Sequence, residues 1–179
     1  QGRVLSASGA LLPETGAEYK IRFMLRKNVC EIMLDTTGDG LHKRGYRRNA
    51  MEAPIRETLA ATIADLGRVR RDSLVEDPFC GSGTLLIEAA QKAMNIAPGL
   101  KRRFAAERYS FVPASIWAEQ RQKALAESKL DVGFEAFGYD IDPAAVALAN
   151  ANAKLAGVEK RCHFEVADVA DFAARSEAI

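Results

Sequence analysis

The residues best suited to ligand chemistry in this 179-residue chain form one short loop with two glycines. The loop consists of Asp77, Pro78, Phe79, Cys80, Gly81, Ser82, Gly83 and Thr84. The glycines let the backbone pass close to a ligand, because a Cβ would collide with it or forbid the required dihedral angles. Leu86 stands where a third glycine would complete a dinucleotide fingerprint, and no Gly-Lys-Ser/Thr follows to form a P-loop. The loop therefore fits a phosphate cradle poorly, and a purely structural tight turn is the alternative to a ligand site.

Two acidic positions further along the chain add to this loop. Asp140, with Ile141 beside it, ends a predicted strand, and a carboxylate there can accept hydrogen bonds from both hydroxyls of a ribose. Such charge-assisted bonds contribute about 1.5–3 kcal/mol each when shielded from water. Asp168 follows the next strand, where it could meet the exocyclic amine of an adenine or serve as a turn residue. Asp142 is better explained as the N-cap of the helix that Pro143 opens.

Alternating strands and helices must position these residues. Apolar runs predict strands over residues 73–76, 134–139 and 161–167, with helices over 84–95 and 143–157 between them. This alternation predicts an α/β fold with a parallel sheet and right-handed crossovers. Open sheets of this kind bind ligands beyond the carboxyl ends of their strands, where the loop and both acids lie.

The first third of the chain has a different pattern. Alternating apolar residues over 19–25 and an extended run over 29–34 predict a β-hairpin, which on its own is marginally stable in water. We therefore expect it to finish a domain that began upstream. Pro54 and Gly67 bracket a predicted helix whose apolar residues recur at near-helical spacing. These residues are Ile55, Leu59, Ile63 and Leu66. Another helix is expected over 113–128.

The loop and the two acids, after three successive strands, resemble motifs I, II and III of class I methyltransferases, whose cofactor is S-adenosylmethionine (SAM). This resemblance implies that the loop of residues 77–84 faces the methionine part of the cofactor, Asp140 the ribose and Asp168 the adenine.

Four segments resemble one group more closely, the bacterial THUMP-containing large-subunit rRNA guanine-N2 methyltransferases, often labelled N6-adenine-specific DNA methylases. The segments are Leu41-His-Lys-Arg-Gly-Tyr-Arg47, Ala53-Pro-Ile-Arg-Glu57, the loop of residues 77–84 and Asn95-Ile-Ala-Pro-Gly-Leu100. The resemblance implies a Rossmann-like sheet in the order 3-2-1. It divides the chain into the end of a THUMP-like RNA-binding domain (1–40), a basic linker with a helix (41–71) and the SAM-binding half of a methyltransferase domain (72–179).

The resemblance implies methyl transfer to the exocyclic N2 of a guanine in large-subunit rRNA. The alternatives are methylation of adenine N6 in DNA and a nucleic-acid-binding module that no longer catalyses. Enzymes of this group carry Asn-Pro-Pro-Tyr after the fourth strand, and residues 1–179 contain no such sequence. Hydrogen bonds to this motif align the target amine, and alignment contributes up to about 7–11 kcal/mol. We therefore expect no turnover by this chain alone, and its catalytic residues are unknown.

The basic residues of the linker are the expected RNA contacts, because of their position and the family resemblance. They are Lys43, Arg44, Arg47 and Arg48. A second basic and aromatic group could stack on an unpaired base or pack as a lid, and we favour packing. It comprises Arg103, Phe104, Arg108, Tyr109, Phe111 and Trp117.

Composition narrows the remaining possibilities. The three cysteines, Cys30, Cys80 and Cys162, lack CxxC spacing and fit a reducing compartment, so we expect a cytoplasmic protein. We expect no membrane role, since no apolar run approaches about 20 residues, and no metal site, since the two histidines have no partner at ligand spacing. Strand 73–76 would have an unpaired edge without a fourth strand, so we expect self-association.

Overall fold

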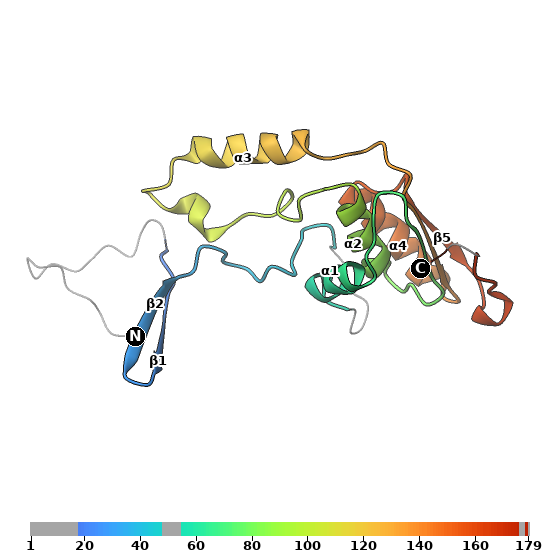
Figure 1. Cartoon of the computed structure of the whole chain (residues 1–179), viewed down its shortest axis with the longest axis horizontal. Helices are drawn as coiled ribbons and strands as arrows, with labels where there is room; N and C mark the ends of the chain where they lie inside the picture. The colour runs from blue at the N-terminus through green and yellow to red at the C-terminus, as the bar shows by residue number, and fades with distance from the viewer. Residues whose placement is uncertain (1–17, 48–54, 176–177, 179) are drawn as a thin grey trace, which may run out of the picture.

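The computed structural model describes residues 18–47, 55–175 and 178. A hairpin lies at one end of the molecule, and a sheet with its helices lies at the other (Figure 1). The hairpin consists of β1 (Ile21–Arg26) and β2 (Val29–Leu34), which pair antiparallel. Two segments connect the ends: residues 35–47, and the stretch after α2 that carries the short helix η1 (Ala105–Arg108) and then α3 (Ala114–Ala126).

Three parallel strands form the main sheet. They are β3 (Leu74–Asp77), β4 (Glu135–Asp140) and β5 (Cys162–Val166), in the order β3-β4-β5. This order confirms the sequence prediction, and every strand end differs from its predicted position by one residue. Helices α2 (Thr84–Ala93) and α4 (Pro143–Ala156) contact each other and the strands, so they cover one face of the sheet. The fold is the expected Rossmann-like α/β arrangement.

The packing of α2 on β4 depends on a position without a side chain. A Cβ on Gly138 of β4 would lie 2.6 Å from the Phe164 ring and 2.9 Å from both Leu86 and Cys80. Leu86 and Phe134 are completely buried in the same core. Because protein cores are packed at crystal-like density, these neighbours have little room to move. The close approach brings the start of α2, and the loop before it, over the end of β4.

Helix α1 (Glu57–Leu66) forms as predicted, but the residues it buries are not the expected ones. Ala60 and Ala64 are buried, whereas Leu59, Ile63 and Leu66 are 53%, 40% and 78% exposed. The regularly spaced Leu59, Ile63 and Leu66 therefore do not form the packed face of this helix. Helix α1 packs against α2, and small alanine side chains allow two helices to approach closely. Gly67 is the C-cap, as expected. Pro54 lies outside the described residues.

The ends of α4 and of the hairpin strands follow local rules. Asp142 accepts a hydrogen bond from the Ala144 amide at 2.9 Å, Pro143 is the first helical residue, and Gly157 ends the helix with φ 82°. The role predicted for Asp142 is thereby confirmed. The hairpin turn is formed by Lys27 and Asn28, both with positive φ, as in the turns that suit the twist of two-residue hairpins.

The outer edge of β3 is not bare in the described part of the chain. Ala178 makes an isolated parallel bridge to Leu74, and the Arg175 guanidinium pairs with Glu76. The same guanidinium donates a hydrogen bond to the Tyr139 hydroxyl at 3.1 Å. Self-association through this edge stays a prediction. Within residues 18–47, 55–175 and 178, no helix is long and apolar enough to cross a membrane.

The hairpin exit is bound by the segment that leads into α3. Arg102 donates hydrogen bonds to the carbonyl oxygens of Asp39 and Gly40, at 2.5 and 2.9 Å. The Tyr109 hydroxyl donates to the carbonyl oxygen of Asp35 at 2.5 Å. These bonds connect two segments more than 60 residues apart in the chain. They hold the hairpin exit against the segment that leads into α3.

The contact at Gly138 leads to a stability prediction. Gly138→Ala is expected to lower the free energy of unfolding by about 1–3 kcal/mol, because the added methyl group overpacks the junction of β4, β5 and α2. Urea denaturation would measure the loss. The matched control is Gly133→Ala, since a Cβ there has no neighbour closer than 3.8 Å. Equal stability of the two variants would contradict the argument.

Candidate functional site

The loop of residues 77–84 crosses the carboxyl ends of β3 and β4. The Cys80 amide donates to the Tyr139 carbonyl at 2.9 Å, and the Gly83 amide donates to the Cys80 carbonyl at 2.8 Å. Gly81 and Gly83 both have positive φ, 52° and 75°, a conformation in which a Cβ is strained. The glycines are therefore required by the backbone path, as the sequence predicted.

The two glycines have different surroundings. A Cβ on Gly83 would lie 2.8 Å from the Phe164 ring and 3.0 Å from Ala149, so Gly83 is packed against the core. A Cβ on Gly81 would meet nothing within 4 Å. Gly81 therefore borders open space, and its backbone is accessible to a ligand.

Asp140 connects the loop to β4. One carboxylate oxygen accepts a hydrogen bond from the Gly81 amide at 3.0 Å, and the other accepts from the Asp142 amide at 2.9 Å. A carboxylate offers about four acceptor positions, so two remain for hydroxyl groups of a ligand. The predicted ribose contact is compatible with this geometry, and it stays a prediction.

Asp77, at the end of β3, makes the site electronegative. Burial raises the pKa of its carboxyl group, the hydrogen bond from the Phe79 amide opposes this shift, and the Asp140 carboxylate adds to it. Ionised, two carboxylates in one partly buried region favour a positively charged ligand group. Large apolar side chains stand at the same edge of the sheet, since Phe79 is 71% and Ile141 69% exposed. Such surfaces suit the flat face of an aromatic base.

The third predicted acid lies at the next strand end. Asp168 follows β5 and caps the short helix η2 (Val169–Asp171), where it accepts a hydrogen bond from the Ala170 amide at 2.9 Å. Its side chain is exposed. The turn role is therefore seen directly, and contact with an adenine amine stays a prediction.

One contributor to the loop was missed from the sequence. Asn152 of α4 is 1% exposed and donates to the Ser82 carbonyl at 3.1 Å. Ser82 and Thr84 also share a hydrogen bond at 3.1 Å. A polar residue among the buried alanines of α4 was the available signal. Asn152 and Asp140 together attach the loop to two different elements.

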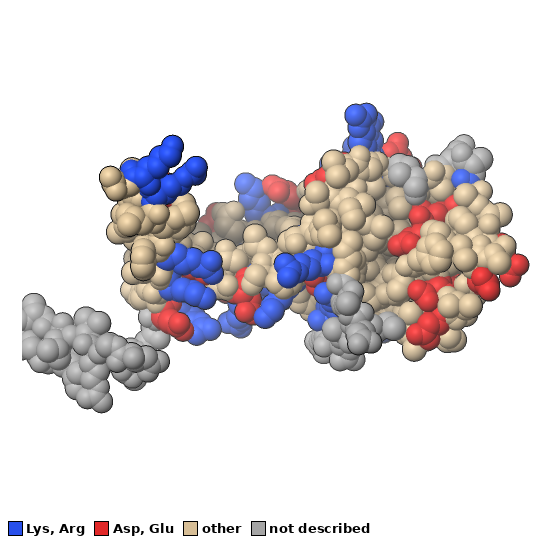
Figure 2. All heavy atoms as spheres, turned by 90° about the horizontal axis from the view of Figure 1, so that it is seen from below, with Lys and Arg blue, Asp and Glu red and all other residues tan. Residues whose placement is uncertain are grey.

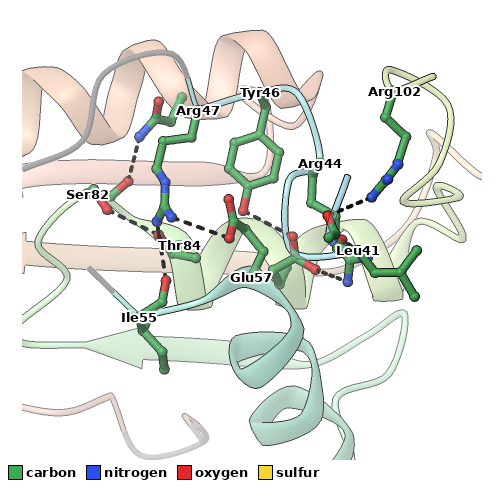
Figure 3. Close-up of polar contacts among 12 residues, drawn as sticks. Leu41, Arg44, Tyr46, Arg47, Ile55, Glu57, Ser82, Thr84 and Arg102 are labelled. Atoms are coloured by element: carbon green, nitrogen blue, oxygen red, sulfur yellow. Dashed lines mark hydrogen bonds and ion pairs between the residues drawn. The ribbon is translucent and has the colours of Figure 1, made fainter. Parts of the chain in front are cut away.

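Two of the predicted RNA-binding arginines point inward (Figure 3). Arg44 pairs with Glu88 of α2 at 3.4 Å, and Arg47 pairs with Glu57 of α1 at 3.3 Å. All four side chains are at most 14% exposed. The prediction that Arg44 and Arg47 are free for phosphate contact is therefore corrected, because buried carboxylates already neutralise both guanidinium groups.

Figure 3 shows the further hydrogen bonds around these ion pairs. The Arg47 guanidinium also donates to the Thr84 hydroxyl at 3.3 Å and to the Ile55 carbonyl at 3.2 Å. The buried Tyr46 hydroxyl donates to Glu88 at 3.0 Å. Arg47 thus connects the linker and α1 to the last residue of the loop. Lys43 remains exposed, beside Asp39, and Arg48 lies outside the described residues.

The aromatic group is packed, as favoured. Phe104 and Trp117 stack with ring centroids 5.5 Å apart, and Tyr109 stacks on Tyr19 at 4.7 Å. Phe111 also packs against Tyr109, although it is 65% exposed. Tyr109 and Phe111 thus pack against Tyr19, which lies just before the hairpin, and Phe104 packs against Trp117 of α3.

Cys80 has the environment of a structural thiol. Burial, followed by the charges of Asp77 and Asp140, raises the pKa of its thiol to about 12. The thiolate is therefore scarce at neutral pH, and a nucleophilic role is disfavoured. In the described part of the chain, no cluster of His, Cys, Asp and Glu has the geometry of a metal site.

Comparison with known proteins places this geometry in context. A family profile described as "UPF0020: RMKL-like, methyltransferase domain" matches residues 44–179. The chain is 42% identical over 166 residues to YpsC of Bacillus subtilis, named as a candidate RNA methyltransferase, over 93% of this chain and 43% of YpsC. It is also 42% identical over 166 residues to ribosomal RNA large subunit methyltransferase K/L of Shewanella baltica, over 90% of this chain and 23% of that protein.

A solved structure is also similar to this chain. SMU.472, titled a candidate methyltransferase complexed with SAH (S-adenosylhomocysteine), superposes with a TM-score of 0.83 at 40% identity, over 93% of this chain and 43% of that one. The chain therefore spans less than half the length of each of these three proteins.

The raised pKa of Asp77 leads to a pH prediction. Because its folded-state pKa exceeds the unfolded value, the native state binds the proton more tightly, and the buried charge costs stability once pH rises above the folded pKa. Asp77→Asn keeps an acceptor for the Phe79 amide and removes the charge. The variant is expected to have the higher melting temperature at pH 7.

The difference in melting temperature between Asp77→Asn and the unaltered chain should shrink as pH falls toward the unfolded pKa of an aspartate, about 3.9. Thermal denaturation from pH 4 to 7 measures it. A difference that does not change with pH would mean that the charge of Asp77 is not penalised in the folded state.

Proposed function

Because the chain belongs to the UPF0020 (RMKL-like) methyltransferase family, we propose that residues 77–84, Asp140, Ile141 and Asp168 bind S-adenosylmethionine for methyl transfer to a base in RNA. The observation that best supports this proposal is the open backbone at Gly81, which the Asp140 carboxylate holds at the carboxyl edge of the sheet. Open α/β sheets bind their ligands at this edge.

The electrostatics of the site support this cofactor. SAM carries two cationic groups, an ammonium and a sulfonium, next to its adenosine. The carboxylates of Asp77 and Asp140 lie close enough for one to raise the pKa of the other, and a cationic ligand would relieve that repulsion. The exposed side chains of Phe79 and Ile141 offer apolar surface to the adenine.

The proposed substrate is large-subunit rRNA, and the proposed acceptor is the exocyclic N2 of a guanine. The rRNA substrate is supported by the named activity of the Shewanella relative. The guanine N2 acceptor rests on the resemblance of the four sequence segments. Methylation of adenine N6 in DNA is not favoured. The protein is proposed to act in the cytoplasm, consistent with three free cysteines.

Calorimetric titration of SAH tests the cofactor site. Asp140→Ala is expected to weaken binding by about tenfold or more, because it removes both the proposed ribose acceptor and the attachment of the loop. NADH is expected not to bind. The matched control is Asp142→Ala, which should lower helix stability by about 1 kcal/mol and leave the affinity for SAH unchanged. Equal loss of affinity in both variants would contradict the assigned roles.

A methyl-transfer assay tests the need for residues beyond this chain. We expect residues 1–179 to bind SAH but to transfer no labelled methyl group from SAM to rRNA, because the amine-aligning motif of the family is not among them. A longer protein that includes this motif should be active. Detectable transfer by the 179-residue chain would refute this part of the proposal.

A further inference from the structure

A basic cavity of about 550 Å³ lies where the linker meets the segment before η1. The cationic side chains that line it are Lys43, Arg44, Arg47, Arg102 and Arg103, and His42 and the acidic residues Asp39 and Glu57 also line it. The two walls are in close contact, since a Cβ on Gly45 would lie only 2.7 Å from the carbonyl oxygen of Lys101. The cavity is distinct from the loop of residues 77–84, none of which lines it.

Most of these cations have a carboxylate partner. Lys43 pairs with Asp39 at 3.3 Å, and Arg44 and Arg47 have the buried partners Glu88 and Glu57. Arg102 and Arg103 are different, because neither forms a salt bridge with any residue in the described ranges.

Arg102 is the most unusual of the group. Its side chain is 93% buried, since only 7% of the residue is exposed. Its guanidinium donates to the neutral carbonyl oxygens of Asp39 and Gly40, and among the described residues its Nε has no hydrogen-bond partner. A buried charge without a counter-charge is costly. An anion in the cavity would offset that cost and pair with Arg103 at the same time.

A second cavity, of about 800 Å³, adjoins the first, since the two share Asp39 and Arg103. Its other charged residues are Lys20, Arg108 and Arg121, with Glu18 and Glu107. At the other end, Arg47 lines the first cavity and donates a hydrogen bond to Thr84 of the cofactor loop. The two adjoining cavities, called the groove below, have room for more than one phosphate of a chain.

The distribution of surface charge also favours an anionic ligand in this region. On the face shown in Figure 2, Lys and Arg gather over the hairpin and the connecting segments, whereas Asp and Glu gather over the sheet end. Phosphate groups are recognised well by arginine, whose planar guanidinium can donate two parallel hydrogen bonds.

We infer that the cavity around Arg102 and Arg103 binds a backbone phosphate of the RNA substrate and that the groove leads the strand toward the cofactor loop. The inference rests on the proposed function. It moves the main phosphate contact from Arg44 and Arg47 to Arg102 and Arg103, with Lys43 at the rim.

The test is fluorescence anisotropy with a labelled single-stranded RNA and the 179-residue chain, over a range of salt concentrations. Lys43→Ala/Arg103→Ala is expected to weaken binding at least tenfold. It should also reduce the slope of log K against log salt by about 0.7 for each lost phosphate contact. The matched control, Lys154→Ala/Lys160→Ala, removes two exposed cations elsewhere and should leave the affinity within twofold. Arg102→Gln removes the buried charge, and the RNA affinity of this variant tests whether that charge contributes to binding. Circular dichroism verifies that the variant is folded.

SAH titration of the same variants separates the two proposals. If SAH binds normally and RNA affinity is the same in the Lys43/Arg103 variant as in the control, the phosphate site is wrong while the proposed function stands. If the unaltered chain binds no SAH, the proposed function fails instead. Inorganic phosphate is the last probe. Stabilisation by phosphate that needs Arg103, with unchanged RNA affinity, would show a free-anion site and overturn the inference.

Discussion

The close packing at Gly138 is the constraint on which the rest of the site depends. Because β4 has no side chain there, Phe164, Leu86 and Cys80 all approach its backbone. This contact sets the height of α2 above the sheet and brings the loop before α2 over the end of β4. Only then can the Gly81 amide reach the Asp140 carboxylate at 3.0 Å. Core packing and the geometry of the proposed cofactor site are thus one feature of the fold.

A second set of interactions attaches the linker to this core. Arg44 pairs with Glu88 of α2, and Arg47 pairs with Glu57 of α1. Removing one member of a buried ion pair leaves the other charge uncompensated, which typically costs about 3–5 kcal/mol. The linker is therefore an integral part of the methyltransferase domain. Since Arg47 also touches Thr84, the position of the linker and the shape of the loop are coupled.

The chain separates opposite charges that nearly cancel in its net charge of +1. The partly buried carboxylates of Asp77 and Asp140 at the strand ends form the proposed site for a cationic cofactor, and the guanidinium groups of Arg102 and Arg103 form the proposed site for an anionic strand. Arg47 lies between these two regions. An average charge carries no information about partners when the two signs are segregated in this way.

The sequence by itself determined the features that depend on neighbouring residues. Three local features could be predicted because backbone sterics and capping act over a few residues: the glycines of the loop, the Asp142-Pro143 helix start and the hairpin. The strand order was implied by the resemblance to class I methyltransferases. The position of Asp140 at a strand end followed from the same pattern. Only the tertiary structure decided which helix face is buried and which arginines are neutralised. Ala60 and Ala64 of α1, rather than Leu59 and Ile63, are buried. The spacing of apolar residues defines the faces of a helix, but it does not show which face another element will cover. Arg44 finds its carboxylate 44 residues away, and a contact over that distance in sequence exists only after the helices have packed.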